Sequence, residues 1–63
     1  MKRKSATYLA KVWIGDQRIT SEHRALDGKD VRRMALRDYP RADRVQVYVE
    51  LPSGPVVVED WRI

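Results

Sequence analysis

The sequence predicts an α+β fold: ββαββ, a four-stranded antiparallel sheet in the order 2-1-3-4 with one helix packed on one face. Residues 27–39 carry the single convincing helical pattern in the 63-residue chain. One pair of segments with β-type alternation precedes the helix, and a second pair follows it. The crossover makes the second and third strands parallel, which leaves room for the first strand between them. Each hairpin has one apolar face that needs a cover, and the helix is the available cover.

The first hairpin follows from its turn. The Gly-Asp pair at residues 15–16 favours a two-residue turn of the I′ or II′ kind between strands over residues 8–14 and 17–23. A two-residue turn fixes the register, so one face of the hairpin is apolar and Trp13 lies opposite Arg18 on the other. That pair is positioned for a cation–π contact.

The helix is expected to begin after Asp27, whose carboxylate can cap the free amides of the first turn. Pro40 ends the helix, because the residue before a proline is pushed out of the α region. At about 100° per residue, Val31 and Met34 fall on one apolar side that should face the sheet. The far side of the helix, its flank and the following loop are basic: Lys29, Arg33 and Arg37, then Arg32, Arg41 and Arg44.

Residues 44–51 alternate apolar and polar side chains and form the clearest predicted strand. Residues 52–55 form the turn, and the last strand opens on three valines. With residues 53–54 at the tip of the turn, Leu51 faces Val56 across the hairpin.

The end of the last strand has two alternatives. Continued in the same register, the strand would turn Asp60 toward the core and Trp61 toward solvent. Because a buried, unpaired carboxylate is costly, either the pairing ends early or a bulge at residues 59–60 turns Trp61 inward, and the sequence leaves both open. The predicted core contains the apolar residues of the inner faces: Tyr8, Ala10, Val12, Ile14, Ile19, Leu26, Val31, Met34, Ala35, Val45, Val47, Val49, Leu51, Val56 and Val58.

Length and composition predict one domain over residues 6–63 behind a disordered basic arm over residues 1–5. The chain has no cysteine, which excludes a disulfide or a thiolate zinc site and fits a cytoplasmic protein of a bacterial host. No apolar run approaches the ~20 residues of a membrane span. The net charge of +4 favours nucleic acid or an acidic protein as the partner.

The sequence carries no catalytic set, so we expect a protein that is not an enzyme. His23 is the single histidine, and a general base needs an orienting partner and a pocket. The three glycines are isolated and form no phosphate-binding loop. Carboxylates such as Glu59 and Asp60 lack metal-binding spacing, and we expect neither a metal nor a cofactor.

Three surfaces are candidates for binding. On the helix, Lys29, Arg33 and Arg37 repeat like charges at i,i+4 spacing. Like charges at this spacing destabilise a helix slightly. Their presence therefore favours a site that binds phosphate or carboxylate over a face that is merely solvated. The uncharged strand edge at residues 56–58 invites pairing with another chain, as in a homodimer. The outer sheet face mixes apolar and aromatic side chains with arginine, which suits base stacking or a protein contact: Leu9, Trp13, Arg18, Tyr48, Val57 and Trp61.

In size, element order and basic helix surface, the chain resembles small phage-encoded anti-CRISPR proteins of the type I inhibitor group. The resemblance spans residues 8–63. It implies a non-enzymatic protein that binds a crRNA-guided surveillance complex and obstructs DNA binding, with Arg32, Arg33 and Arg37 contacting a groove of that complex. The layout is also similar to the sheet-plus-helix DNA-binding domains of phage and transposon integrases, although those carry three strands before the helix.

We therefore expect a small, basic, non-catalytic binding protein that docks on a nucleoprotein complex, in the form of an anti-CRISPR inhibitor. A DNA-binding accessory domain of phage or mobile-element origin is the first alternative. A homodimerising structural module that uses the last strand edge is the second.

Overall fold

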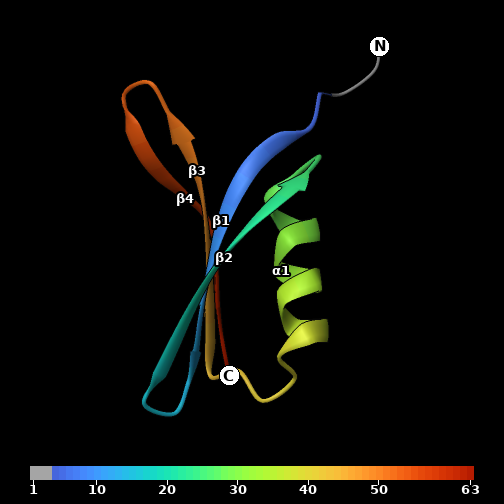
Figure 1. Ribbon diagram of the computed structural model, residues 1–63, viewed down its shortest axis with the longest axis vertical. Coiled ribbons are helices and arrows are strands. Elements are labelled where there is room, and N and C mark those ends of the chain that lie inside the picture. Colours follow the sequence, from blue (N-terminus) through green and yellow to red (C-terminus); the bar gives the residue numbers. More distant parts are fainter. Residues whose placement is uncertain (1–3) are drawn as a thin grey trace.

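The computed structural model describes residues 4–63, which form an antiparallel sheet in the order β2-β1-β3-β4 with helix α1 across one face (Figure 1). The predicted α+β fold and strand order are confirmed. Of the predicted arm, residues 1–3 lie outside the described residues, while Lys4 and Ser5 are exposed and belong to no element. The elements are β1 (Ala6–Ile14), β2 (Gln17–Ala25), α1 (Gly28–Asp38), β3 (Arg44–Leu51) and β4 (Gly54–Arg62).

The β1–β2 hairpin has the predicted register, with Ile14 opposite Gln17. Gly15 adopts a positive φ of 56°, a left-handed conformation that glycine reaches without steric cost. Its amide donates a hydrogen bond of 2.7 Å to Oδ2 of Asp43. The amide of Asp43 donates in turn to the carbonyl of Trp13 at 2.8 Å. The loop between α1 and β3 is therefore fixed to the tip of the first hairpin.

Helix α1 begins and ends as its sequence predicts. The Asp27 side chain accepts a 3.0 Å hydrogen bond from the amide of Asp30, and the amide of Tyr39 donates to the carbonyl of Ala35 at 2.8 Å. Val31 and Ala35 are buried against the sheet. The side that carries Arg33 and Arg37 faces solvent, so the orientation of the helix is confirmed.

The core lies under α1 and ends where α1 ends. An 11-residue helix is about 16 Å long, whereas a nine-residue strand spans about 30 Å, so the helix covers only part of the inner face of the sheet. The prediction that Leu51 and Val56 are buried is therefore wrong, since these side chains are 47% and 42% exposed. Leu26, in the connection between β2 and α1, and Val58, on β4, were also predicted to be buried, and they are 51% and 39% exposed. Ala42 is buried although the pattern missed it. The buried core consists of Ala10, Val12, Val31, Ala35, Ala42, Val45 and Val47.

The β3–β4 hairpin differs from its prediction in register. Leu51 pairs with Gly54, so the tip is at residues 52–53, and Leu51 does not face Val56. Farther along, Tyr48 pairs with Val57 and Val47 pairs with Glu59, which leaves Val58 as the extra residue of a β-bulge.

The bulge determines which face of the sheet the last side chains of β4 point to. It lies one residue earlier than the expected bulge and turns Trp61 to the inner face, where Trp61 pairs with Val45 and packs on the core. The prediction of Trp61 as part of the outer sheet face is therefore wrong. Asp60 faces outward instead, where arginines hold it, so the bulge avoids a buried, unpaired carboxylate.

Gly28 shows how closely α1 approaches this bulge. A Cβ atom at Gly28 would lie 2.6 Å from Cγ2 of Val58, a distance that real Cβ atoms do not show. The glycine thus permits the first turn of the helix to rest on β4. On the next turn, Nη1 of Arg32 lies 3.2 Å from Oε1 of Glu59 and ties the helix to the same strand.

Candidate binding surfaces

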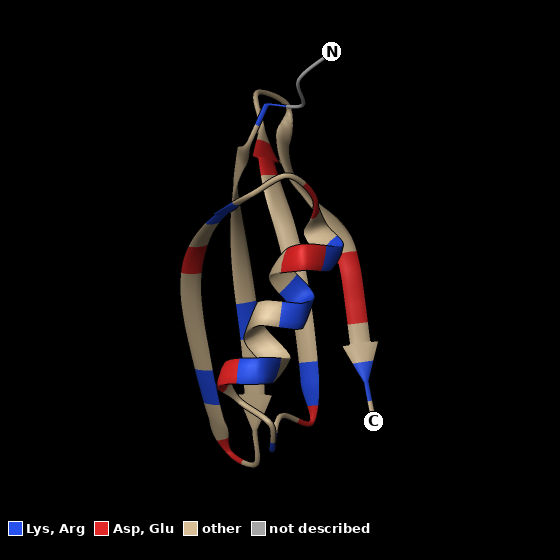
Figure 2. Cartoon of the chain, turned by 90° about the vertical axis from the view of Figure 1, so that its right-hand side faces the viewer, with Lys and Arg blue, Asp and Glu red and all other residues tan. Residues whose placement is uncertain are grey.

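The basic side of α1 is formed by the exposed residues Lys29, Arg33 and Arg37. Figure 2 shows α1 lying in front of the sheet, with several basic positions along it. Successive members are four residues apart and therefore rise by about 6 Å along the helix. The side chains of Arg33 and Arg37 are 71% and 76% exposed. Each lies at long ion-pair distance from a neighbouring carboxylate, Asp30 at 3.8 Å and Asp38 at 3.6 Å. Such exposed pairs are weak, so both guanidinium groups remain available to a partner.

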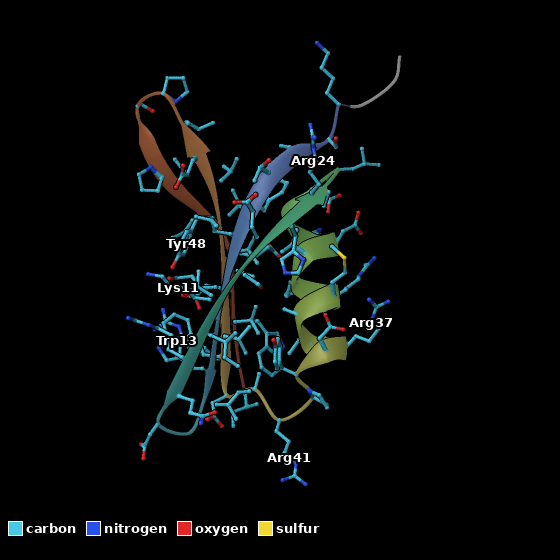
Figure 3. The ribbon with its side chains drawn as sticks, viewed as in Figure 1. Lys11, Trp13, Arg24, Arg37, Arg41 and Tyr48 are labelled. Carbon is cyan, nitrogen blue, oxygen red and sulfur yellow. The ribbon has the colours of Figure 1, made fainter. Side chains whose placement is uncertain are left out.

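The other three predicted basic residues divide between different surroundings. Arg32 is on the flank of α1 and is held by Glu59. Arg41 is exposed in the loop at the end of the helix, on the same side of the molecule (Figure 3). Arg44 was expected beside this basic surface, and that placement is wrong. The loop has returned the chain to the sheet by residue 44, and Arg44 lies opposite Trp13 on the outer face.

The outer sheet face is the side of the sheet opposite α1, and the central strands bring two aromatic rings to it. Trp13 of β1 and Tyr48 of β3 are half-buried there (Figure 3). The guanidinium of Arg44 lies 4.9 Å from the centroid of the Trp13 ring, and Nζ of Lys11 lies 5.0 Å from that of Tyr48. The predicted pairing of Arg18 with Trp13 is correct in register, but the cation over the ring is Arg44.

Asp60 holds one end of this face in place. Its two carboxylate oxygens accept hydrogen bonds from Nε and Nη2 of Arg44 at 3.1 and 3.0 Å, and Arg62 lies 3.6 Å away. These hydrogen bonds lower the pKa of the Asp60 carboxyl below its ordinary value and raise the pKa of Arg44, outweighing the partial loss of water around both groups. The charge of Arg44 is therefore already engaged within the protein.

Next to Asp60, the outer face has a hollow of about 260 Å³ between β1, β3 and β4, lined in part by Lys11, Gln46 and Tyr48. Gln46 lies directly opposite Lys11, and Tyr48 is the next outward residue of β3. The Tyr48 hydroxyl is buried and has no hydrogen-bond partner among residues 4–63. Sequence reasoning singled out Tyr48 but missed Lys11 and Gln46, although strand alternation places both on the same face.

The edge of the sheet at β4 exposes three valines, Val56, Val57 and Val58, at 42%, 50% and 39%. The prediction that this strand lies at an edge is confirmed. The bulge at Val58 interrupts the flat ladder that a second strand would need, because a bulge bends and twists its strand. A second hollow, of about 440 Å³, lies between the start of β1 and the end of β3 and is lined mainly by apolar groups beside Glu22 and Glu50.

His23 lies on the inner face, where its Nε2 is 2.8 Å from the hydroxyl oxygen of Ser21. No carboxylate of the described residues orients this ring by a hydrogen bond. Within residues 4–63, no group of three or more His, Asp or Glu side chains could hold a metal ion, and no helix is long and apolar enough to cross a membrane.

Comparison with known proteins gives no match, whether with family models, curated proteins or solved structures. What the chain binds is therefore inferred from its own residues.

Proposed function

We propose that this chain is a non-catalytic binding domain that docks on a nucleoprotein complex through the basic side of α1. The observation that carries this proposal is the exposure of Lys29, Arg33 and Arg37 in one row. Like charges at i,i+4 spacing destabilise a helix slightly, and weak pairs with Asp30 and Asp38 offset only part of that cost. Arginine forks can hold phosphate or carboxylate in two parallel hydrogen bonds, so the row suits a strongly acidic surface.

More specifically, we propose that the chain is an anti-CRISPR inhibitor that blocks DNA binding by a crRNA-guided surveillance complex. The small size, the ββαββ order and the exposed basic helix support this form. A complex of this kind presents both acidic nucleic acid and protein grooves, and Arg41 extends the basic surface in the direction of the loop.

Co-elution with purified type I surveillance complexes tests this function. The variant Arg33→Ala/Arg37→Ala removes two exposed cations and keeps the helix, because alanine is a strong helix former. A matched control, Lys4→Ala/Arg18→Ala, removes two exposed cations outside α1, with Arg18 on the opposite face of the sheet. We expect the helix variant to bind at least about tenfold more weakly and the control to bind as the parent does. Failure of the parent to bind any complex tried, or equal losses in both variants, would contradict the proposal.

Direct binding of duplex DNA is a second candidate for the same surface. It is favoured by the row of three cations on one exposed helix side. Three phosphate contacts would give a log-log salt slope of about −2.7. A salt titration with a short duplex would show this slope, and a flat response would exclude direct binding.

Homodimerisation is a third candidate, supported by the exposed valines at the β4 edge. Sedimentation equilibrium should then show a dimer that Val57→Lys abolishes, because a charge at a strand edge opposes pairing. A monomer at high protein concentration would exclude it.

A further inference from the structure

We propose that the outer sheet face binds single-stranded nucleic acid, with Lys11, Gln46 and Tyr48 as one contact point and Trp13 as a second. This face lies opposite α1 (Figure 3), so its ligand is independent of whatever α1 contacts. Its basic side chains outnumber its acidic ones, five to three, by strand register: Lys11, Arg18, Arg24, Arg44 and Arg62 against Glu22, Glu50 and Asp60.

The first contact point is a cluster of three side chains that can each donate a hydrogen bond. Lys11 makes no ion pair with any described residue, although its ammonium is held over the Tyr48 ring. Gln46 faces Lys11, and the buried Tyr48 hydroxyl has no partner among residues 4–63. Buried donors are normally satisfied, so a hydroxyl without a protein partner beside a cation and an amide is open to an acceptor from a ligand. An anionic oxygen matches all three groups.

The hollow beside these donors limits what the ligand can be. At about 260 Å³ it is smaller than the ~300–1,000 Å³ of pockets that enclose a whole small molecule. Pro55 and Val57 give it an apolar wall. The hollow therefore fits one unit of a polymer that carries both an anionic oxygen and an apolar ring, and a nucleotide is such a unit.

The second contact point lies along the same face. Arg44 faces Trp13 and is four residues before Tyr48 on β3, so the backbone positions of Trp13 and Tyr48 are about 13 Å apart along the strand direction. Arg44 lies over Trp13 and Lys11 lies over Tyr48, so a base would stack on the cation that covers a ring or take its place. Only bases that are not paired in a duplex can stack in this way. An acidic peptide would satisfy Lys11 but would not present a flat ring at each unit. The spaced rings thus favour a single strand over an acidic protein.

Fluorescence anisotropy tests this surface with a labelled oligothymidylate of about 12 nucleotides, within the range of site sizes of small single-strand-binding domains. Lys11→Met removes the ammonium and keeps the chain over the ring. Lys29→Met makes the same change in net charge on the opposite side of the molecule. We expect Lys11→Met to weaken binding about tenfold and to reduce the log-log salt slope by about 0.7. Lys29→Met should change affinity by less than about twofold.

Two further variants locate the contact. Tyr48→Phe removes only the hydroxyl and should weaken oligothymidylate binding by about tenfold or more, because the proposed acceptor is an anionic oxygen. Trp61→Phe leaves Trp13 as the single tryptophan, since the chain has two. The fluorescence of Trp13 should be quenched when bases stack on its indole ring.

Duplex DNA, oligouridylate and polyglutamate complete the test. Oligouridylate should bind as a single strand, whereas duplex DNA and polyglutamate should bind more weakly and leave Trp13 fluorescence unchanged. Equal losses for Lys11→Met and Lys29→Met would overturn the proposal. Equal binding of polyglutamate, or binding without quenching of Trp13, would overturn it as well. None of these outcomes depends on whether α1 binds a surveillance complex.

Discussion

The side of the sheet beneath α1 buries valine and alanine side chains, with Tyr8, Tyr39 and Trp61 packed around them, whereas the opposite side carries two half-buried aromatic rings beneath cations. The inner side stabilises the fold by removing valine and alanine side chains from water. The outer side has no helix of the described residues to cover it, and long side chains such as Lys11 and Arg44 shield its rings instead. A thin domain of this kind can thus use one face for folding and leave the bonding groups of the other face for a ligand.

Replacing a valine on each side should give the largest contrast between the two. Val47→Ala removes a fully buried side chain from the core and should lower the free energy of unfolding by about 2–3 kcal/mol. Val57→Ala makes the same change at a side chain that is 50% exposed, and should cost less than about 0.5 kcal/mol. Urea denaturation measures both variants. Similar losses would show that the outer face contributes to stability as the core does.

Gly28→Ala tests how tightly α1 rests on the inner side. Alanine is the better helix former, yet its Cβ would meet Cγ2 of Val58 at 2.6 Å. We expect a loss of about 1–2 kcal/mol in the free energy of unfolding. In the background of Val58→Ala the loss should largely disappear, which a double-mutant cycle would reveal as non-additivity. Additive losses would show that the destabilisation by Gly28→Ala does not come from the contact with Val58.

Asp60, on the outer side, should make a smaller contribution to the free energy of unfolding, and this contribution should depend on pH. Because the pKa of Asp60 is lowered in the folded protein, the unfolded chain binds more protons near that pKa, and stability rises with pH. The contribution is present above the ordinary aspartate pKa of about 3.9 and is lost as the pH falls through the lower folded-state value. The difference in stability between the parent and Asp60→Asn should therefore shrink as the solution is acidified below about pH 4.

Thermal melts across that pH range, with Glu50→Gln as a control, check this expectation. Glu50 is an exposed carboxylate on the same face that makes no ion pair with a described residue. A difference between the parent and Asp60→Asn that stays constant with pH would mean that the bonds from Arg44 do not lower the pKa of Asp60.

The smallest effect on stability is expected for Tyr48→Phe. Its hydroxyl is buried without a partner among residues 4–63, so removing it relieves a desolvation cost and breaks no hydrogen bond. The free energy of unfolding should stay the same or rise slightly. A loss above about 1 kcal/mol would show that the hydroxyl is hydrogen-bonded in the free protein.

The first hairpin and α1 could be predicted from local signals alone. The two-residue turn at Gly15 permits a single register, and Asp27 and Pro40 bound the helix in the ways their chemistry dictates. The second hairpin could not be predicted in the same way, because the residues around Gly54 allow more than one tip. The bulge at Val58 then depends on contacts with α1 that lie far away in sequence.

The candidate surfaces, too, could be predicted where they depend on one element and not where they depend on several. The exposed row on α1 could be read from helical spacing, since it depends on one element. Arg44 was grouped with the basic helix because it follows the basic loop, although the alternation along residues 44–51 places it on the outer face. Tyr48 was found, but its unsatisfied hydroxyl and its neighbour Lys11 emerge only when three strands are assembled.

The difference in role between the two faces is tested most directly by a ¹H–¹⁵N NMR titration of the labelled protein with oligothymidylate. The indole N–H signals of Trp13 and Trp61 report on opposite sides of the sheet. We predict that the Trp13 indole and the amides of Lys11 and Tyr48 shift, while the Trp61 indole and the amides of α1 stay in place. Shifts confined to α1, with the Trp13 indole unmoved, would contradict the account.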